Sequence, residues 1–138
     1  MSPSFNHSYI QVNLGAAFKK LNTYSVLSEL SIEINGKEYE PDLCLYSKRK
    51  MQRTEDIVRM TEIPLLAVEI LSTSQTIKDA TDKFKIYFGA GVKSCWLIEP
   101  FTQSVTVFQT IHEAKTFFEG MVIDTIMDLK IEILEVFD

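Results

Sequence analysis

Glu69 is the residue whose chemistry fits its surroundings least well. It lies within residues 64–71, an almost continuous apolar run that is typical of a central strand covered on both faces. An ionised carboxylate in such a strand costs several kcal/mol unless it is paired, hydrogen-bonded or bound to a cation. Three structural explanations remain open: an edge strand whose glutamate faces water, a structural ion pair with a lysine, and a position near the exposed end of the strand.

Asp42 is the second candidate for chemistry. It follows Pro41 at the beginning of an extended segment, where a carboxylate can project from the end of a sheet. A turn-forming aspartate next to a proline is the common alternative, so Asp42 alone is weak evidence for a site.

Two lysines lie on the helix predicted after Glu69. At 100° per residue, Lys83 falls about 40° from Tyr87, at one edge of the buried stripe, and Lys85 flanks the opposite edge. Helical geometry therefore does not choose between them. Snorkelling to solvent is the usual alternative for either lysine.

Two carboxylates and a lysine at the ends of neighbouring strands suit metal-dependent hydrolysis of phosphodiester bonds. Mg²⁺ prefers oxygen ligands and uses one or two carboxylates together with waters. Such a metal acidifies a bound water and offsets charge on the phosphate. The lysine would hold that water or the negative charge that develops during the reaction.

The elements that must position these residues begin with an amphipathic helix. Asn6 is expected to cap a helix over residues 7–21, in which apolar residues recur at helical spacing. In residues 24–34, apolar residues recur with a period of two, which is typical of a strand. Asn35-Gly36 is a strong hairpin signal, because both positions of a type I′ turn need positive φ.

The middle of the chain contains a long polar segment. Residues 41–46 continue the hairpin as another extended segment, and residues 47–63 lack clear periodicity. We expect a long loop there, and loops of this length in a domain are often functional. Four of the six residues 48–53 are basic (Lys48, Arg49, Lys50 and Arg53), which indicates either a solvated loop or a surface that contacts phosphates.

The second half of the chain alternates between strand and helix patterns. A helical stripe begins at Ile77 and ends at Gly89-Ala90-Gly91, a good C-terminal stop. The further predicted elements are strands over 92–99 and 104–110, a hairpin of 116–118 with 121–123, and a strand or short helix over 129–137. The order predicts an α/β domain with a mixed sheet.

Composition limits the function classes. The 138 residues are 46% hydrophobic and 24% charged, which suits a single folded domain over residues 1–138 and excludes disordered and collagen-like chains. No apolar run is long enough to span a bilayer and no signal peptide is visible, so we expect a cytoplasmic location. The net charge of −5 argues against nucleic-acid binding across the whole surface.

Two further features exclude other chemistry. Cys44 and Cys95 share no metal-like spacing, and we expect two buried thiols. No glycine-rich phosphate loop follows a strand, so a nucleotide-binding or oxidoreductase domain has no support.

Several motifs together resemble the Uma-type endonuclease family, part of the PD-(D/E)XK restriction-endonuclease-like superfamily and common in bacteria. The motifs that carry this resemblance are Pro41-Asp42, Val68-Glu69-Ile70-Leu71-Ser72, Asp82-Lys83 with Tyr87, Gly91-Val92, and Trp96-Leu97-Ile98-Glu99-Pro100. Met1-Ser2-Pro3 and His7 are similar to the family's segment before its first long helix. The similarity runs from about Ser2 to the C-terminus.

The resemblance implies a restriction-endonuclease-like fold, with a mixed central β-sheet flanked by helices. It implies that Asp42 and Glu69 are ligands of Mg²⁺ or Mn²⁺. Leu71 occupies the position of the lysine in the usual Glu-X-Lys triplet, and a lysine on the following helix takes over in this family. Lys83, four residues before Tyr87, matches that position and Lys85 does not. The implied catalytic residues are therefore Asp42, Glu69 and Lys83.

Two interpretations follow from this resemblance. The first is a metal-dependent endodeoxyribonuclease whose partners are DNA and a divalent metal, with no membrane, and which forms a homodimer by analogy with other nucleases of the superfamily. The second is a catalytically inactive binding or dimerisation module on the same fold, in which Glu69 and Lys83 form a buried ion pair. The pI of 5.1 and the expected edge strands motivate the second interpretation.

One departure from the family also motivates the second interpretation. Members usually carry a helix and hairpin with an acidic residue ahead of the Ser2-Pro3 stretch, and the sequence begins at that stretch. His7 belongs to the helical stripe, and its role as a core histidine or as a contributor to the site stays open.

Overall fold

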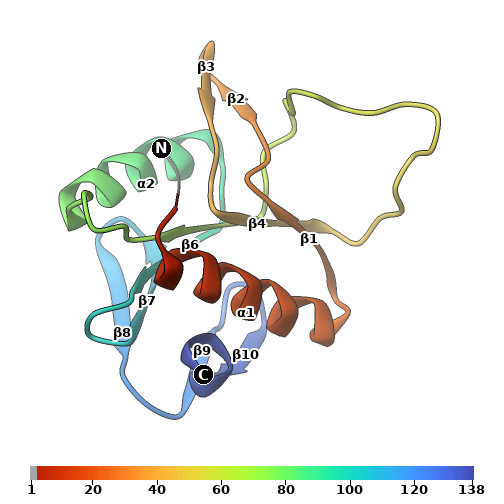
Figure 1. Ribbon diagram of the computed structural model, residues 1–138. Helices are drawn as coiled ribbons and strands as arrows, with labels where there is room; N and C mark the ends of the chain where they lie inside the picture. Colours follow the sequence, from red (N-terminus) through yellow and green to blue (C-terminus); the bar gives the residue numbers. More distant parts are fainter. Residues whose placement is uncertain (1–2) are drawn as a thin grey trace.

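Six strands form the central sheet of the computed structural model, which describes residues 3–138 (Figure 1). Along the chain, the elements are α1 (Phe5–Leu21), β1 (Tyr24–Ser28), β2 (Ile32–Ile34), β3 (Lys37–Tyr39), β4 (Leu43–Ser47), β5 (Leu66–Ile70), α2 (Ile77–Ala90), β6 (Ser94–Glu99), β7 (Ser104–Thr110), β8 (Glu113–Phe117), β9 (Met121–Asp124), β10 (Leu129–Glu132) and α3 (Leu134–Phe137). Met1 and Ser2, which belong to the segment similar to the family's N-terminal stretch, lie outside the described residues.

The sheet is mixed, as the sequence predicts. Its strand order is β1-β4-β5-β6-β7-β8. β5 and β6 run parallel and are connected by α2, whereas the other neighbouring pairs are antiparallel. A parallel pair needs a crossover of this kind, because a tight turn cannot return the chain to the starting edge.

Helices cover both faces of the sheet (Figure 1). α1, α3 and the β9–β10 hairpin pack on one face, where Trp96 contacts Phe18 with ring centroids 5.2 Å apart. α2 and the β2–β3 hairpin pack on the other face, where Phe84 and Phe108 are also 5.2 Å apart. The two apolar clusters explain why the central strands are buried throughout.

The first helix begins earlier than predicted. Ser4 caps α1, because its Oγ accepts a hydrogen bond of 3.2 Å from the backbone N–H of His7. The expectation that Asn6 caps a helix starting at His7 is therefore wrong by two residues. Both serine and asparagine serve as caps, so residue type alone does not distinguish Ser4 from Asn6.

The central strand and the helix after it form as predicted. Every residue of β5 is buried. α2 begins with a capping box in which Thr76 Oγ1 accepts from the Asp79 backbone N–H and the Asp79 carboxylate accepts from that of Thr76. α2 ends at Gly91, whose φ of 112° suits glycine.

The first predicted hairpin is confirmed, but the strand before it is divided. Asn35 and Gly36 have φ values of 52° and 77° and connect β2 to β3. Residues 24–34 are not one strand, because Glu29 adopts a φ of 52°. β1 then pairs with β4, whereas β2 pairs with β3.

The second predicted hairpin is wrong. β8 pairs with β7 and β9 pairs with β10, so residues 116–118 and 121–123 do not pair with each other. Val122 is buried on β9, and its partner Ile131 is buried on β10, which favours that pairing over the predicted one. Residues 129–137 contain both of the alternatives, β10 and then α3.

Three other expectations concern the rest of the chain. Residues 47–63 form the predicted long loop, with one isolated bridge between Ile32 and Met60. Cys44 and Cys95 are buried free thiols, and burial raises the pKa of Cys44 to about 12. No helix within residues 3–138 has both the length and the apolar character that crossing a membrane requires.

Candidate active site

Asp42 lies immediately before β4 and is held from two sides. Its Oδ2 accepts a hydrogen bond of 2.7 Å from the backbone N–H of Ile70 in β5. Its Oδ1 lies 3.0 Å from Nε2 of His7, which belongs to α1. The side chain is 17% exposed, so the carboxylate is held in place but still meets solvent.

Glu69 lies near the end of β5, and its side chain is only 4% exposed. Lys83 Nζ lies 3.2 Å from its Oε1, and Tyr87 donates a hydrogen bond of 3.0 Å to its Oε2. Both partners come from α2. β5 lies between β4 and β6, so Glu69 is not on a water-facing edge strand, and its burial also excludes an exposed strand end. The ion pair with Lys83 is the structural explanation that is left.

The two carboxylates lie beside each other at one end of the sheet. The backbone N–H of Asp42 donates to the carbonyl of Val68, and the Asp42 carboxylate accepts from Ile70, so Asp42 bonds to both chain neighbours of Glu69. Burial and, to a smaller extent, the negative charge of Asp42 together raise the pKa of Glu69 to about 7, against the opposing effects of Lys83 and Tyr87. Burial likewise raises the pKa of Asp42, against the hydrogen bond from Ile70 and the charge of His7.

The structure distinguishes the two lysines that helical geometry left equivalent. Lys83 points to Glu69, whereas Lys85 Nζ lies 3.8 Å from Asp82 on the surface of α2. Lys83 is 37% exposed, so its ammonium group contacts the buried Glu69 carboxylate and is also accessible to solvent. Such a position allows a lysine to hold a group that enters from outside.

Three further residues contact these carboxylates or the chain beside them, although the sequence predicted no role in the site for them: Gln11, Glu29 and Tyr87. Gln11 Nε2 donates to Glu29 Oε2 and to the backbone carbonyl of Asp42, both at 3.1 Å. The spacing of 18 residues between Glu69 and Tyr87 crosses from a strand to a helix, so no periodicity signals it. The positive φ of Glu29 was equally invisible in the sequence.

His7 is buried and contacts Asp42, although its role was open from the sequence. Its Nδ1 has no hydrogen-bond partner within the part of the chain that the structure describes. A buried ring nitrogen without a partner is unusual in a packed core. His7 is therefore a residue of the site and not only a member of the apolar stripe.

The donor set suits a hard divalent cation. Both carboxylates supply oxygen atoms, each with a further lone pair beyond the bonds described above. Mg²⁺ and Mn²⁺ are held by one or two carboxylates with waters completing the coordination. Among residues 3–138 no group of three or more His, Cys, Asp or Glu side chains is arranged to hold a metal, so Asp42 and Glu69 would need waters as further ligands.

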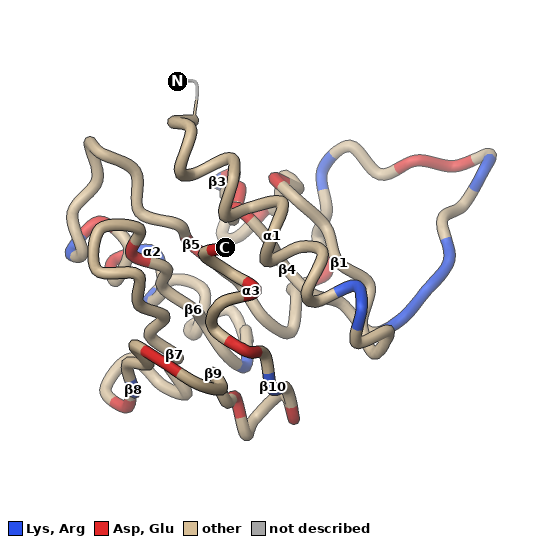
Figure 2. Tube along the Cα trace, turned by 60° about the horizontal axis from the view of Figure 1, so that its bottom comes forward, with Lys and Arg blue, Asp and Glu red and all other residues tan. Residues whose placement is uncertain are grey.

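The basic residues 48–53 lie away from the carboxylates. They follow β4, whereas Asp42 precedes it, so the strand separates them by about 20 Å at roughly 3.3 Å per residue. Figure 2 shows this loop, with its blue segments, extending from the body of the protein. These residues are exposed and do not contribute to the carboxylate site itself.

Asp124 is a third buried carboxylate, and its hydrogen bonds stabilise the fold. It is fully buried and accepts hydrogen bonds from Ser94 Oγ, Trp96 Nε1 and the backbone N–H of Met127, at 3.1, 2.8 and 3.0 Å. These three donors join β9 to β6 and to the turn after β9. A carboxylate without access to solvent is not available to a substrate.

Known proteins share both the sequence pattern and the fold. The family model of Uma2, described as a putative restriction endonuclease, matches residues 1–125. A solved structure described as a putative nuclease belonging to DUF820, from Anabaena variabilis, has a TM-score of 0.80 at 22% identity and covers 99% of this chain and 83% of that chain. No curated protein matches the sequence.

The structural similarity confirms the predicted restriction-endonuclease-like fold, with its mixed central sheet flanked by helices. The family match extends over most of the sequence, from the N-terminal helix to the turn after β9. The chain therefore belongs to the Uma2 family of restriction-endonuclease-like proteins.

Proposed function

We propose that this protein is a Mg²⁺- or Mn²⁺-dependent nuclease that hydrolyses phosphodiester bonds in DNA. The observation that carries this proposal is the juxtaposition of two carboxylates, Asp42 and Glu69, at one end of the sheet with Lys83 beside them. The description of the Uma2 family and of its structural relative supports the same class of reaction.

In this proposal, different residues bind the cation and position the attacking water. Asp42 and Glu69 would hold the cation, which, when bound, supplies an acidified water and offsets phosphate charge. Lys83 orients the attacking water or balances charge on the phosphate, because its ammonium group is at once fixed by Glu69 and open to solvent. Tyr87 holds the second oxygen of Glu69 and so fixes the direction of the first.

His7 has a positioning role in this proposal. Its Nε2 holds Oδ1 of Asp42, while the Ile70 N–H holds Oδ2. Groups that fix a metal-binding carboxylate restrict its rotation and so preorganise the site. His7 therefore acts through Asp42 and not on the phosphate.

Calorimetric titration with Mn²⁺ and Mg²⁺, on the wild type and on Asp42→Ala and Glu69→Ala, tests the proposal. We expect binding by the wild type that both substitutions abolish, together with loss of metal-dependent cutting of plasmid DNA. Circular dichroism of each variant verifies that it is folded. Normal cutting by a folded Asp42→Ala or Glu69→Ala variant would contradict the assignment.

The second candidate function is a catalytically inactive binding or dimerisation module. One observation favours it: all four oxygens of Asp42 and Glu69 already have protein partners, as an inherited structural ion-pair network would. In that case neither metal binds, and replacing both members of the ion pair by apolar residues (Glu69→Leu/Lys83→Met) maintains or raises the stability of the fold. Sedimentation analysis then decides whether the chain is a homodimer.

A further inference from the structure

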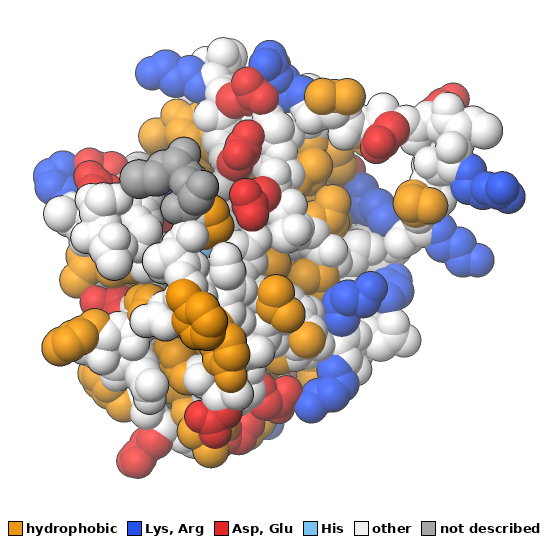
Figure 3. Space-filling view, in the orientation of Figure 1, with side chains coloured by type: hydrophobic (Ala, Val, Ile, Leu, Met, Phe, Trp, Pro, Cys, Tyr) orange, Lys and Arg blue, Asp and Glu red, His pale blue; other side chains and the backbone are white. Residues whose placement is uncertain are grey.

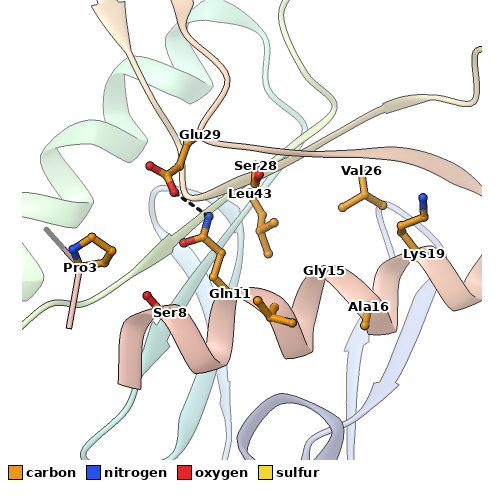
Figure 4. Close-up of a pocket in the computed structure, with 11 residues that line it drawn as sticks. Pro3, Ser8, Gln11, Gly15, Ala16, Lys19, Val26, Ser28, Glu29 and Leu43 are labelled. Atoms are coloured by element: carbon orange, nitrogen blue, oxygen red, sulfur yellow. Dashed lines mark hydrogen bonds between the residues drawn. The ribbon is translucent and has the colours of Figure 1, made fainter. Parts of the chain in front are cut away.

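A groove runs along the outside of α1, from the neighbourhood of Asp42 towards the basic loop. Its first part is a hollow of about 390 Å³ between α1 and β1. Figure 4 shows Gln11 and Glu29, joined by a hydrogen bond, at one end of this hollow and Lys19 at the other. Because Gln11 also bonds the backbone of Asp42, the groove begins next to the carboxylate site.

The groove continues beyond Lys19. A second hollow, of about 760 Å³, lies between β1 and the loop after β4, and Lys19 and Val26 line both hollows. Met51 and Ile57, both exposed, add apolar surface to the second hollow.

Cations without acidic partners gather at the far end of this groove. Within residues 3–138, no carboxylate lies within ion-pair distance of Lys19, Lys48, Lys50 or Arg53. Figure 3 shows Lys and Arg side chains along the right-hand edge of the molecule, the side on which the loop after β4 lies in Figure 1. Such a local excess of positive charge is notable in a chain whose net charge is −5.

Other charged groups in the region are already balanced or oppose the excess. Arg49 forms an ion pair with Glu62 and lies over the ring of Tyr46. Glu55 and Asp56 line the second hollow and reduce its positive charge. Among the residues that line the second hollow, the cations without an acidic partner (Lys19, Lys48 and Lys50) therefore outnumber these two carboxylates, and Arg53 adds a further cation on the same loop.

We propose that this groove, defined by α1, β1 and residues 48–57, binds the phosphodiester backbone of DNA and leads it to the carboxylates. The basic end contacts phosphates about 20 Å from Asp42, the length of β4 and its flanks. The proposal rests on the proposed nuclease function for the site at the other end. Its physical basis is that phosphate contacts by Lys and Arg supply most of the affinity for nucleic acid.

Fluorescence anisotropy with a labelled DNA duplex of 20 base pairs, in EDTA, tests the basic end. EDTA removes divalent metal, so neither cleavage nor metal bridging affects the measurement. We expect Lys48→Glu/Lys50→Glu to weaken binding at least about tenfold at 0.1 M salt. The slope of log affinity against log salt concentration should fall by about 2, since each duplex phosphate contact contributes about 0.9.

A matched variant controls for net charge. Lys115→Glu/Lys130→Glu produces the same change in charge at two exposed lysines on β8 and β10. We expect its affinity to stay within about twofold of the wild type, because salt at 0.1 M screens exposed charges beyond about 10 Å. Equal weakening in the two variants, or no binding by the wild type, would overturn the proposal.

A groove-filling substitution tests the path without altering charge. Ala16→Trp places a large ring on the exposed surface of α1 within the first hollow. We expect weaker DNA binding with an unchanged thermal midpoint; unchanged binding would mean that the DNA does not follow this groove.

The failure of this proposal and that of the nuclease function are distinguishable. Asp42→Ala should retain DNA binding in EDTA while losing metal-dependent cutting. If the wild type cuts DNA but Lys48→Glu/Lys50→Glu binds normally, the groove proposal alone fails. If the groove variants weaken binding but Asp42→Ala still cuts, the site assignment alone fails.

Discussion

Lys83 Nζ lies 3.2 Å from Oε1 of Glu69, although the two residues are 14 positions apart on a helix and a strand. This contact places a half-exposed cation against a carboxylate that is almost fully buried. The pair thus extends from the buried face of the sheet to the protein surface. Lys83 differs in this contact from Lys85 on the same helix, and the two lysines should therefore differ in their effect on stability.

Removing the two lysines of α2 in turn should have unequal effects. Lys83→Met leaves Glu69 with Tyr87 alone, and an under-satisfied buried group costs about 1–3 kcal/mol of unfolding free energy. Lys85→Met removes only a long surface contact with Asp82 and should change stability by less than about 0.5 kcal/mol. Urea denaturation at pH 8 measures both. Similar values for the two variants would show that the contact with Glu69 has no energetic weight.

Glu69→Gln should make stability less dependent on pH. Burial raises the pKa of Glu69 from 4.5 to about 7, so the folded protein binds this proton more tightly than the unfolded chain does. The corresponding stability is present below pH 4.5 and is lost as pH rises through 7. Glutamine does not titrate, so the variant should gain stability relative to the wild type as pH rises from about 4.5 to 7. The change is on the order of 3 kcal/mol.

Chemical denaturation of the wild type and Glu69→Gln at pH 5, 6, 7 and 8 gives this difference directly. Glu55→Gln, at an exposed position on the loop, serves as the control for a neutralised carboxylate. A difference between Glu69→Gln and wild type that stays constant over this range would mean that Glu69 does not titrate within it.

His7→Ala should weaken metal binding through Asp42. The substitution removes the partner of Oδ1, which lies 3.0 Å from the imidazole, and leaves the carboxylate free to rotate. Loss of such a supporting contact typically reduces metal affinity by about 10–100-fold. His7→Gln, whose amide can donate to the same oxygen, should recover part of the affinity. Calorimetry with Mn²⁺ measures both variants.

The other histidine of the chain is the control for this experiment. His112 is exposed and lies in the turn between β7 and β8, and β8 is the edge strand opposite β1. We expect His112→Ala to bind Mn²⁺ as the wild type does. If His7→Ala also does so, His7 has a packing role only.

Asp124→Ala should destabilise the fold without affecting the metal site. The substitution leaves Ser94, Trp96 and the backbone of Met127 without their common acceptor in a fully buried position. We expect a loss of about 3 kcal/mol or more, since each buried donor left without a partner costs about 1–3 kcal/mol. Fluorescence of Trp96, the single tryptophan, reports the unfolding transition.

Stability and Mn²⁺ affinity, measured on the same variant, distinguish a structural role of Asp124 from a role in metal binding. Where the variant remains folded at low temperature, its affinity for Mn²⁺ should equal that of the wild type. Glu113→Ala, at an exposed position on β8, should leave both stability and affinity unchanged. A folded Asp124→Ala variant that loses Mn²⁺ binding would place Asp124 in the metal site and contradict its structural assignment.

Much of the local structure was predictable because neighbouring residues decide it. The apolar run around Glu69 predicted a buried central strand, and the positive φ that type I′ turns require made Asn35-Gly36 a reliable hairpin signal. Helical periodicity and glycine predicted α2 and its end. The elements that carry Asp42, Glu69 and Lys83 were therefore predictable, and the family resemblance then assigned their proposed roles.

Pairing between distant segments was not predictable in the same way. The strand pattern of residues 121–123 fits several partners, and β9 pairs with β10 because both can bury their apolar side chains against the sheet. The division of residues 24–34 depends on Glu29, whose left-handed conformation has no signal in its residue type. Serine and asparagine are both common helix caps, so residue type likewise did not distinguish Ser4 from Asn6.

The residue types capable of chemistry were visible in the chain order, but their partners were not. Whether Glu69 meets a lysine, and whether His7 meets Asp42, depends on how two helices cross opposite faces of one sheet. Periodicity constrains only which side of its own element a residue occupies. Contacts between elements come from packing the two apolar clusters together, and that packing brings the carboxylates, the lysine and the histidine to the same end of the sheet.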